Sequence, residues 1–204
     1  MLILRKVAVT GGLSAGKSTV CRLLKELGAY TVSADEIVHQ LLTPNTKIGQ
    51  QVILLLGKEI LRENCIDRAE MGKKVFGKEK TLKSLEQILH PAVLEEIDKQ
   101  YNQVKEKQKY TLFVAEIPLL YESESHKYFD ATVAVVTKQD IAKMRFGERD
   151  SKSDEEYEKR MTHQLSPEEK RAKADFTLVN NTNLEDLKKQ VDHLIEQLTP
   201  TKNK

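Results

Sequence analysis

Five short apolar segments recur along the chain, with patterns typical of helices between them. The segments cover residues 7–9, 30–32, 111–117, 132–136 and 176–179. Apolar segments of this length predict buried strands, because a strand covered on both faces needs few polar side chains. Strands that alternate with helices form a mostly parallel sheet with helices on both faces. The pattern therefore predicts an α/β fold of three layers with a five-stranded, mostly parallel sheet.

Several helices are indicated by an apolar face or by their first residues. The first helix has a stripe at positions i, i+3, i+4 and i+7, formed by Val20, Leu23, Leu24 and Leu27. Gly28 follows that stripe and is suited to ending the helix. Later helices are predicted where a serine cap precedes a glutamate by three residues, at Ser33, Ser153 and Ser166. The last helix has one apolar face over residues 184–198.

Two regions carry helical patterns without strands. Residues 37–110 are predicted to be wholly helical, an insertion in which His90-Pro91 begins a long helix. Residues 141–174 form a second, strongly charged helical region, and the polar stretch 149–153 inside it has the composition of a flap. The length of 204 residues suits one compact domain, so we expect residues 1–204 to be a single unit with these two additions.

The composition is that of an ordinary soluble protein and favours no polymeric partner. Lysine and arginine number 33 and aspartate and glutamate 31, a formal net charge of +2, so neither a nucleic acid nor a membrane is expected as a partner. Cys21 and Cys65 form no CxxC pair, which argues against a zinc site or a disulfide framework. The chain shows no secretory leader and no long apolar stretch, so a cytoplasmic location is expected.

A glycine-rich motif lies between the first predicted strand and the first predicted helix. Residues 11–18 match the pattern G-x-x-x-x-G-K-[ST]. In this motif the backbone N–H groups and the helix N-terminus surround the phosphates of a nucleotide, the lysine bridges the β- and γ-phosphates, and the serine binds Mg²⁺. We therefore expect ATP and Mg²⁺ as cofactors. The residues expected to bind ATP are Gly11, Gly12, Leu13, Ser14, Ala15, Gly16, Lys17, Ser18 and Thr19.

The motif leaves the reaction open, because switch GTPases share it. Such switches usually carry a D-x-x-G element, which this chain lacks, and an N/T-K-x-D element. Residues 137–140 have the second pattern, but they follow a predicted strand and have the spacing of a capped helix start. We interpret them as that helix start. The leading hypothesis is a kinase for a small molecule; a nucleotide-dependent switch or binding module is the alternative from another class.

Two carboxylates follow predicted strands, at the edge of the sheet where ligands of open α/β folds bind. Asp35 comes just after the second strand and could accept the proton of an attacking hydroxyl. It could equally serve only the N-terminus of the next helix. Glu116 ends an apolar strand, where such enzymes place a second acidic residue that holds Mg²⁺ together with Ser18.

Arg145 and Arg149 are four residues apart on one helical face that leads into the flap. Their planar guanidinium groups are suited to gripping the phosphates and offsetting charge in the transition state. Scattered arginines also occur on solvated helices, so the catalytic role assigned to this pair depends on the neighbouring flap.

With these residues assembled, the sequence resembles the dephospho-coenzyme A kinase family nearly from end to end. Beyond the loop, the segments that carry the resemblance are Ala34-Asp35, Ile66-Asp67-Arg68, His90-Pro91, Ile117 to Glu122, Arg145 with Arg149-Asp150, Gln164, Ala174-Asp175 and Asn180. The resemblance implies a P-loop kinase fold and ATP-dependent phosphorylation of the ribose 3′-hydroxyl of dephospho-coenzyme A, the last step of coenzyme A synthesis.

The resemblance also implies residue roles. Asp35 is the base, Lys17 binds phosphate, residues 37–110 bind the coenzyme, residues 141–174 form an arginine lid, and the segment around Asn180 lines the adenine pocket. The chain departs from the family at Ser14 and Ala15, where glycine and serine are usual, and at Glu116, where aspartate is usual. A nucleoside monophosphate or other small-metabolite kinase is the alternative enzyme.

Overall fold

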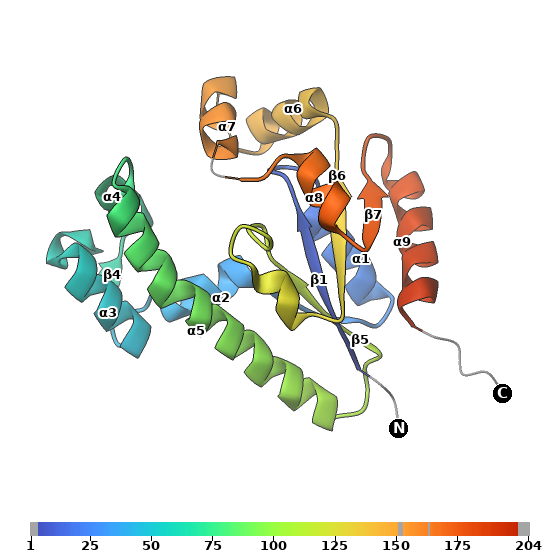
Figure 1. Cartoon of the computed structure of the whole chain (residues 1–204), viewed down its shortest axis with the longest axis horizontal. Coiled ribbons are helices and arrows are strands. Elements are labelled where there is room, and N and C mark those ends of the chain that lie inside the picture. Colours follow the sequence, from blue (N-terminus) through green and yellow to red (C-terminus); the bar gives the residue numbers. More distant parts are fainter. Residues whose placement is uncertain (1–3, 151–152, 163, 200–204) are drawn as a thin grey trace. The chain divides into compact units, whose positions relative to one another are not determined.

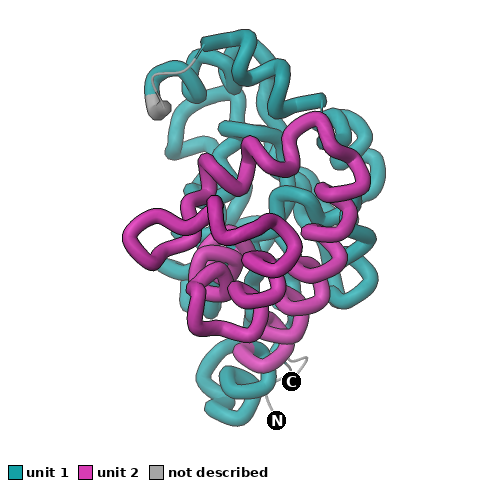
Figure 2. Tube along the Cα trace, turned by 90° about the vertical axis from the view of Figure 1, so that its left-hand side faces the viewer, with its two compact units in different colours: residues 1–33, 101–204 teal, residues 34–100 magenta. Residues whose placement is uncertain are grey.

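The computed structural model describes residues 4–150, 153–162 and 164–199, except for the side chains of residues 149 and 150. The chain forms two compact units. The first contains residues 1–33 and 101–204, and the second contains residues 34–100 (Figure 2). Each unit has its own apolar core.

The first unit is built on a five-stranded parallel sheet with strand order β2-β5-β1-β6-β7 (Figure 1). This confirms the predicted α/β fold and all five predicted strands. Val7 at the centre of the sheet pairs with Val114 on one side and with Ala131 on the other. The strands are β1 (Arg5–Gly11), β2 (Tyr30–Ser33), β5 (Leu112–Glu116), β6 (Ala131–Val136) and β7 (Phe176–Val179).

Helices cover this sheet with their apolar faces. The helices α1 (Lys17–Glu26) and α9 (Leu184–Leu198) share one apolar cluster with β1, β5 and β6. Leu24 of α1 and Val191 of α9 are both fully buried in it, which is the outcome that the i, i+3, i+4 spacing predicts. Figure 1 shows α9 beside β7. The sheet thereby holds α1 fixed at the end of β1.

Three further helices follow β6 and form the predicted charged region. They are α6 (Gln139–Asp150), α7 (Asp154–Met161) and α8 (Pro167–Lys173). Two predicted caps are confirmed: Ser153 accepts a hydrogen bond from the amide of Glu156, and Ser166 forms a capping box with Glu169. Phe146 of α6 and Tyr157 of α7 lie edge to face, with ring centroids 5.7 Å apart. Leu13 of the glycine-rich loop packs against the same cluster.

The second unit is mostly helical and has a separate apolar core. Its helices are α2 (Ala34–Leu41), α3 (Lys47–Leu56), a short 3₁₀ turn (Lys58–Ile60), α4 (Arg68–Val75) and the first part of α5 (Glu79–Glu106). Val52 and Ile60 are fully buried at its centre. The compact unit begins at residue 34, because α2 starts directly after β2. It ends at residue 100, because the Tyr101 hydroxyl already bonds the Leu4 carbonyl of the first unit.

The expectation of a wholly helical region was wrong at one hairpin. β3 (Leu61–Arg62) and β4 (Cys65–Ile66) form an antiparallel pair. The two residues between them, Glu63 and Asn64, have φ angles of 48° and 61°. Positive φ at both central residues is the geometry of a two-residue type I′ hairpin, for which Asn-Gly is the usual sequence. Glu63-Asn64 differs from Asn-Gly, so the local sequence does not indicate a hairpin.

The expectation that His90-Pro91 begins a helix was also wrong. Pro91 lies inside α5, which is 28 residues long and begins at Glu79. A proline in this position has no N–H to donate to the carbonyl of Gln87, one turn earlier, and it normally weakens a helix. The apolar residues on either side, Leu85 and Val93, are both buried, and their packing outweighs that loss.

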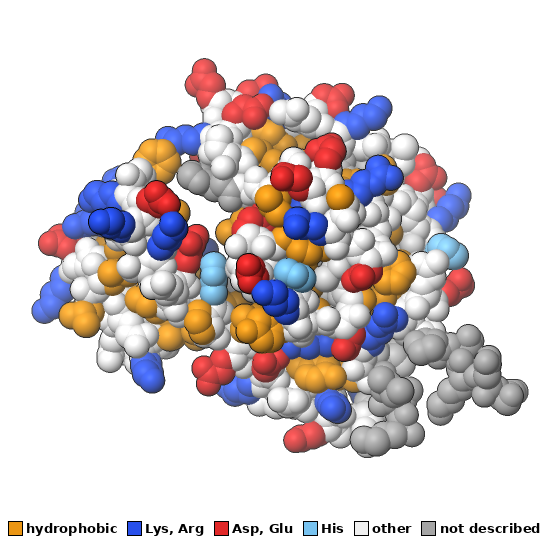
Figure 3. All heavy atoms as spheres, viewed as in Figure 1, with side chains coloured by type: hydrophobic (Ala, Val, Ile, Leu, Met, Phe, Trp, Pro, Cys, Tyr) orange, Lys and Arg blue, Asp and Glu red, His pale blue; other side chains and the backbone are white. Residues whose placement is uncertain are grey.

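The surface agrees with the near balance of charges in the sequence. On the face that Figure 3 shows, acidic and basic side chains are interspersed. In the described part of the chain, no helix combines the length and the apolar character that crossing a bilayer requires.

Candidate nucleotide-binding site

The glycine-rich loop connects the end of β1 to the start of α1, as the motif predicts. Gly16, the residue before the helix, has φ 98° and leaves the helix N-terminus without a side-chain cap. A Cβ atom on Gly16 would lie 2.2 Å from Asn180 Nδ2, and one on Gly11 would lie 2.2 Å from the Val135 carbonyl oxygen. Both positions therefore require glycine. The uncapped amides and the positive end of α1 make this loop suited to binding an anion.

Ser14 occupies a position where glycine is usual in the family that the sequence resembles, and its backbone is strained. Its φ angle is 56°, in the left-handed region. A residue with a side chain loses about 1 kcal/mol or more there relative to glycine. Ser14 Oγ is also buried without a hydrogen-bond partner among the described residues. Neighbouring Ala15 fits readily, since it is buried and its amide donates to the Gly12 carbonyl at 3.3 Å.

Lys17 folds back over the loop. Its Nζ donates to the carbonyl oxygens of Gly11 at 3.2 Å and Gly12 at 2.9 Å. The ammonium group is thus kept within the curve of the loop, where a bound phosphate would meet it. This is the arrangement that phosphate binding by the motif lysine needs.

Ser18 and Glu116 meet at the other side of the loop. Ser18 Oγ donates to Glu116 Oε1 at 2.9 Å. Glu116 ends β5, and the sheet fixes it between Val9 and Ser33 of the neighbouring strands. The described residues contain no group of three or more His, Cys, Asp and Glu side chains suited to a metal. A hydroxyl and a carboxylate at this distance do fit Mg²⁺, which takes few protein oxygens and completes its shell with water and phosphate.

Asn180 connects the loop after β7 to the glycine-rich loop. Its buried side chain donates from Nδ2 to the Ala15 carbonyl at 2.8 Å. Its own carbonyl accepts hydrogen bonds from Arg145 Nη1 at 3.1 Å and Thr137 Oγ1 at 2.8 Å. The structure therefore brings Arg145, Asn180 and the phosphate loop together. Arg149 belongs to α6, but its side chain lies outside the described residues.

Residues 137–140 form a helix start, as interpreted from the sequence. The amide of Lys138 donates to Asn181 Oδ1 at 2.8 Å, and α6 begins at Gln139.

Asp35 lies exposed in the first turn of α2, which belongs to the second unit. Ser33, two residues earlier in the chain, pairs with Glu116 in the sheet. The role of Asp35 as a base stays a prediction.

Cys21 lies in α1 behind the loop and is buried. Burial raises the pKa of its thiol well above the ordinary value, and the Glu116 charge adds to the rise while Lys17 opposes it. A protonated thiol in this place contributes packing rather than reactivity. Cys65, on the hairpin of the second unit, is exposed.

Sequence reasoning missed a polar network behind the loop. Thr10 Oγ1 donates to the Pro118 carbonyl at 3.1 Å, and Lys170 Nζ donates to the same oxygen at 2.6 Å. Lys170 also pairs with Glu122 Oε1 at 3.0 Å. In the sequence, Glu122 belongs to a segment that carries the family resemblance, and Lys170 lies in a charged stretch typical of a solvated helix.

Two family segments have structural explanations. Asp175 accepts hydrogen bonds from the amide and hydroxyl of Thr132, both at 2.8 Å, and so joins the end of α8 to β6. Asp67 caps α4 by accepting from the amides of Ala69 and Glu70.

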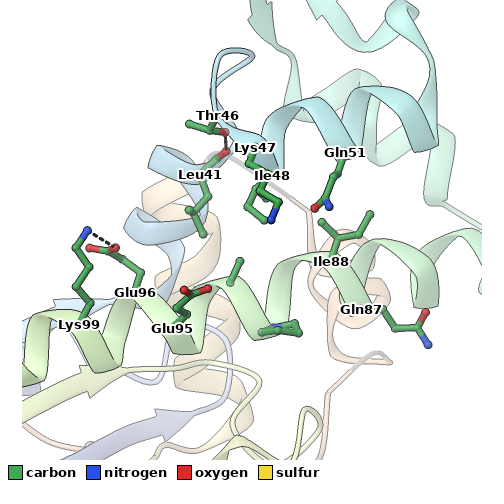
Figure 4. A pocket seen from close by; sticks show the side chains of 12 residues that line it. Leu41, Thr46, Lys47, Ile48, Gln51, Gln87, Ile88, Glu95, Glu96 and Lys99 are labelled. Atoms are coloured by element: carbon green, nitrogen blue, oxygen red, sulfur yellow. Dashed lines mark hydrogen bonds and ion pairs between the residues drawn. The ribbon is translucent and has the colours of Figure 1, made fainter.

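The second unit contains a cavity of about 610 Å³ between α2, α3 and α5 (Figure 4). Gln51 of α3 and Ile88 of α5 point toward one another across it (Figure 4). Apolar side chains provide much of the lining, and the amides of Gln51 and Gln87 and the charged groups of Lys47 and Glu95 lie among them.

Comparison with known proteins agrees with this geometry. A dephospho-CoA kinase from Protochlamydia amoebophila is 49% identical over 199 residues, 97% of this chain and 98% of the relative. The solved dephospho-CoA kinase from Campylobacter jejuni superposes with a TM-score of 0.70 at 28% identity, covering 95% of this chain and 96% of that one. The solved protein TT1252 from Thermus thermophilus gives a TM-score of 0.84 at 27% identity, covering 97% and 100%. The sequence model of dephospho-CoA kinase matches residues 5–186, and the chain therefore belongs to the dephospho-CoA kinase family.

Proposed function

We propose that this protein transfers the γ-phosphoryl group of ATP to the ribose 3′-hydroxyl of dephospho-coenzyme A, giving coenzyme A and ADP. The observation that carries the proposal is the hydrogen bond between Ser18 and Glu116 beside Lys17, in a chain of this family. It supports a triphosphate site with a metal position at its edge, which phosphoryl transfer requires.

The loop residues Gly11 to Thr19 bind the triphosphate through backbone amides, and Lys17 contacts the β- and γ-phosphates. Ser18 and Glu116 hold Mg²⁺, which when bound offsets the charge of the phosphate oxygens. Glu116 has the same charge as the aspartate usual in the family and reaches one methylene farther. Its hydrogen bond to Ser18 at 2.9 Å supports the view that this extra length is accommodated.

Asp35 accepts the proton of the 3′-hydroxyl. As the proton leaves, the hydroxyl oxygen forms a bond to the γ-phosphorus and the bond from that phosphorus to the β–γ bridging oxygen breaks, so that ADP departs with the electron pair. Arg145 and Arg149 stabilise the negative charge of the transferred group. Asp35 is exposed, so its carboxylate is accessible to a ligand.

The helical unit binds the acceptor, and its cavity takes the neutral arm of the coenzyme. That arm carries two amides and a branched apolar segment. Mixed apolar and amide side chains such as Ile48, Ile88 and Gln51 suit these groups. Because Pro91 has no N–H, the Gln87 carbonyl also lacks its usual helical partner and can accept from an amide of the ligand.

The segment around Asn180 lines the adenine pocket. The Asn180 side chain already donates to Ala15, so adenine contacts come from the backbone of this segment and from Arg145 beside it.

A panel of acceptors tests the reaction class. Purified protein with Mg-ATP is assayed against dephospho-coenzyme A, nucleoside monophosphates and other small metabolites. The highest kcat/KM is expected with dephospho-coenzyme A. Faster turnover of another acceptor favours the alternative kinase, and tight nucleotide binding without acceptor-stimulated ADP release favours a switch or binding module.

The Asp35→Asn variant tests the mechanism. It is expected to lower kcat by about 10² or more with little change in ATP affinity. Near-normal turnover would remove Asp35 from the role of base and leave it as a residue that favours the N-terminus of α2. Glu36→Gln, the same charge removal one residue further along α2, is the matched control.

A further inference from the structure

Lys170 is a lysine whose side chain is completely removed from solvent. Its exposed fraction is 0%, and its Nζ donates to the Pro118 carbonyl at 2.6 Å and pairs with Glu122 Oε1 at 3.0 Å. Burial lowers the pKa of Lys170, and the Glu122 carboxylate opposes that shift. The desolvation of a buried ion pair can exceed its attraction, so stability alone is a weak explanation for this charge.

The Pro118 carbonyl receives two hydrogen bonds, from two different elements of the first unit. Lys170 donates from α8, and the buried hydroxyl of Thr10 donates at 3.1 Å from β1. Thr10 directly precedes Gly11, and Pro118 follows Glu116 by two residues. One carbonyl oxygen therefore joins the start of the phosphate loop to the segment that carries the proposed metal ligand.

Glu122 completes the network on the other side of the ammonium group. Its Oε1 accepts from Lys170 and from the amide of Leu165 at 2.8 Å. Its Oε2 is buried without a hydrogen-bond partner in the described part of the chain. A carboxylate bonded through one oxygen relies on its cation for stabilisation. The position of Glu122, and of the chain after Pro118, thus depends on Lys170.

We propose that Lys170 is a positioning residue for phosphoryl transfer: in addition to the pairing of β5 with β1, it holds the segment that follows Glu116 against the end of β1 that leads into the phosphate loop. Lys170 acts through Pro118 and Thr10 and touches neither ATP nor the acceptor. The inference rests on the proposed function, in which Ser18 and Glu116 hold Mg²⁺. Groups bonded directly to a metal ligand contribute about 10- to 100-fold to metal affinity or activity. Lys170 acts one step farther away, through Pro118, so the lower end of that range is expected.

The test uses the full chain and measures ATP affinity by calorimetry with Mg²⁺ and again with EDTA. The ratio of the two affinities is the gain due to Mg²⁺. Lys170→Met is expected to reduce this gain by about tenfold, and to lower kcat by a similar factor without changing the acceptor KM. Lys173→Met removes an exposed charge from the same helix and is the control; it should behave as the wild type.

A purely structural role for Lys170 would lower the thermal midpoint of Lys170→Met and leave the Mg²⁺ gain of the folded protein unchanged, which would overturn the proposal. If Lys170→Met does not fold, Thr10→Val decides, because it keeps the side-chain shape and removes the other donor to Pro118. A reduced gain in Thr10→Val supports the proposal, and an unchanged gain overturns it. A wild type without any Mg²⁺ gain overturns the metal role of Ser18 and Glu116, and the proposal with it.

Discussion

Ser18 and Glu116 are 98 residues apart in the chain, and their side chains are joined by a hydrogen bond of 2.9 Å. The parallel pairing of β1 with β5 produces this contact, because it brings the end of β5 beside the loop that leaves β1. The fold thereby brings a hydroxyl and a carboxylate together at the edge of the proposed phosphate site, and such preorganisation reduces the cost of ordering them on binding.

Glu116→Gln is expected to weaken ATP binding in the presence of Mg²⁺ by about tenfold and to leave binding in EDTA unchanged. The amide keeps the shape and removes the negative charge with which Glu116 is proposed to hold Mg²⁺. Isothermal titration of ATP in the two buffers measures both affinities. Glu26→Gln on α1 is the control, since Glu26 is exposed and paired with Arg22. Equal loss in both buffers would mean that Glu116 supports the loop and has no part in metal binding.

Ser14→Gly is expected to raise the free energy of unfolding by about 1 kcal/mol. Glycine relieves the left-handed backbone strain, worth about 1–2 kcal/mol, at an entropic cost of about 0.5–1 kcal/mol in the unfolded chain. It also removes the buried hydroxyl, whose Oγ lacks a partner. Urea denaturation measures the difference. Ser14→Ala separates the two causes, because alanine keeps the φ of 56° and loses only the hydroxyl. A destabilised Ser14→Gly variant would contradict this explanation.

The two cysteines are expected to differ in reactivity. A thiol reagent at mildly alkaline pH should label Cys65 in the folded protein and leave Cys21 untouched, because burial raises the pKa of Cys21 and blocks access to it. Both should react in denaturant, which mass spectrometry of labelled peptides can verify. Cys65→Ser should leave the folded protein unlabelled; labelling of Cys21 in that variant would show that α1 opens readily.

Lys170 gives a pH dependence of definite sign. Burial lowers its pKa in the folded state below the ordinary 10.5, so the unfolded chain binds this proton more tightly. The contribution of Lys170 to the free energy of unfolding therefore rises with pH between the folded pKa and 10.5. Denaturation at several pH values gives the free energies of unfolding of the wild type and of Lys170→Met. The value of the wild type relative to that of the variant should increase as pH rises through this window. A flat difference, or a shift the other way, would contradict the lowered pKa.

The sequence was sufficient for the fold and the phosphate loop because both depend on local signals. The period of apolar residues predicts the strands and α1. The phosphate loop is recognised from a contiguous motif, residues 11–18, between a strand and a helix. The position of Glu116 at the end of an apolar strand also indicated that it lies near the phosphate loop, and its side chain accepts a hydrogen bond from Ser18 of α1.

Other features depend on contacts between distant residues, which local patterns do not reveal. The hairpin at Glu63-Asn64 lacks the glycine that would signal it, and Pro91 stays inside α5 because packing on both sides outweighs a local rule. Lys170 is separated from Pro118 by 52 residues and is buried against it, although its neighbours in the sequence are charged. Only the fold distinguishes it from a solvated lysine.

The formation of coenzyme A is the direct test of the proposed reaction. Purified protein is incubated with Mg-ATP and dephospho-coenzyme A, and the product is identified by mass spectrometry and by the ³¹P spectrum of a 3′-phosphomonoester. Coenzyme A and an equal amount of ADP are expected from the wild type, and no product from Lys17→Ala, which lacks the phosphate-binding ammonium group. A folded wild type that binds ATP and forms no coenzyme A, or that phosphorylates a different hydroxyl, would contradict the proposed reaction.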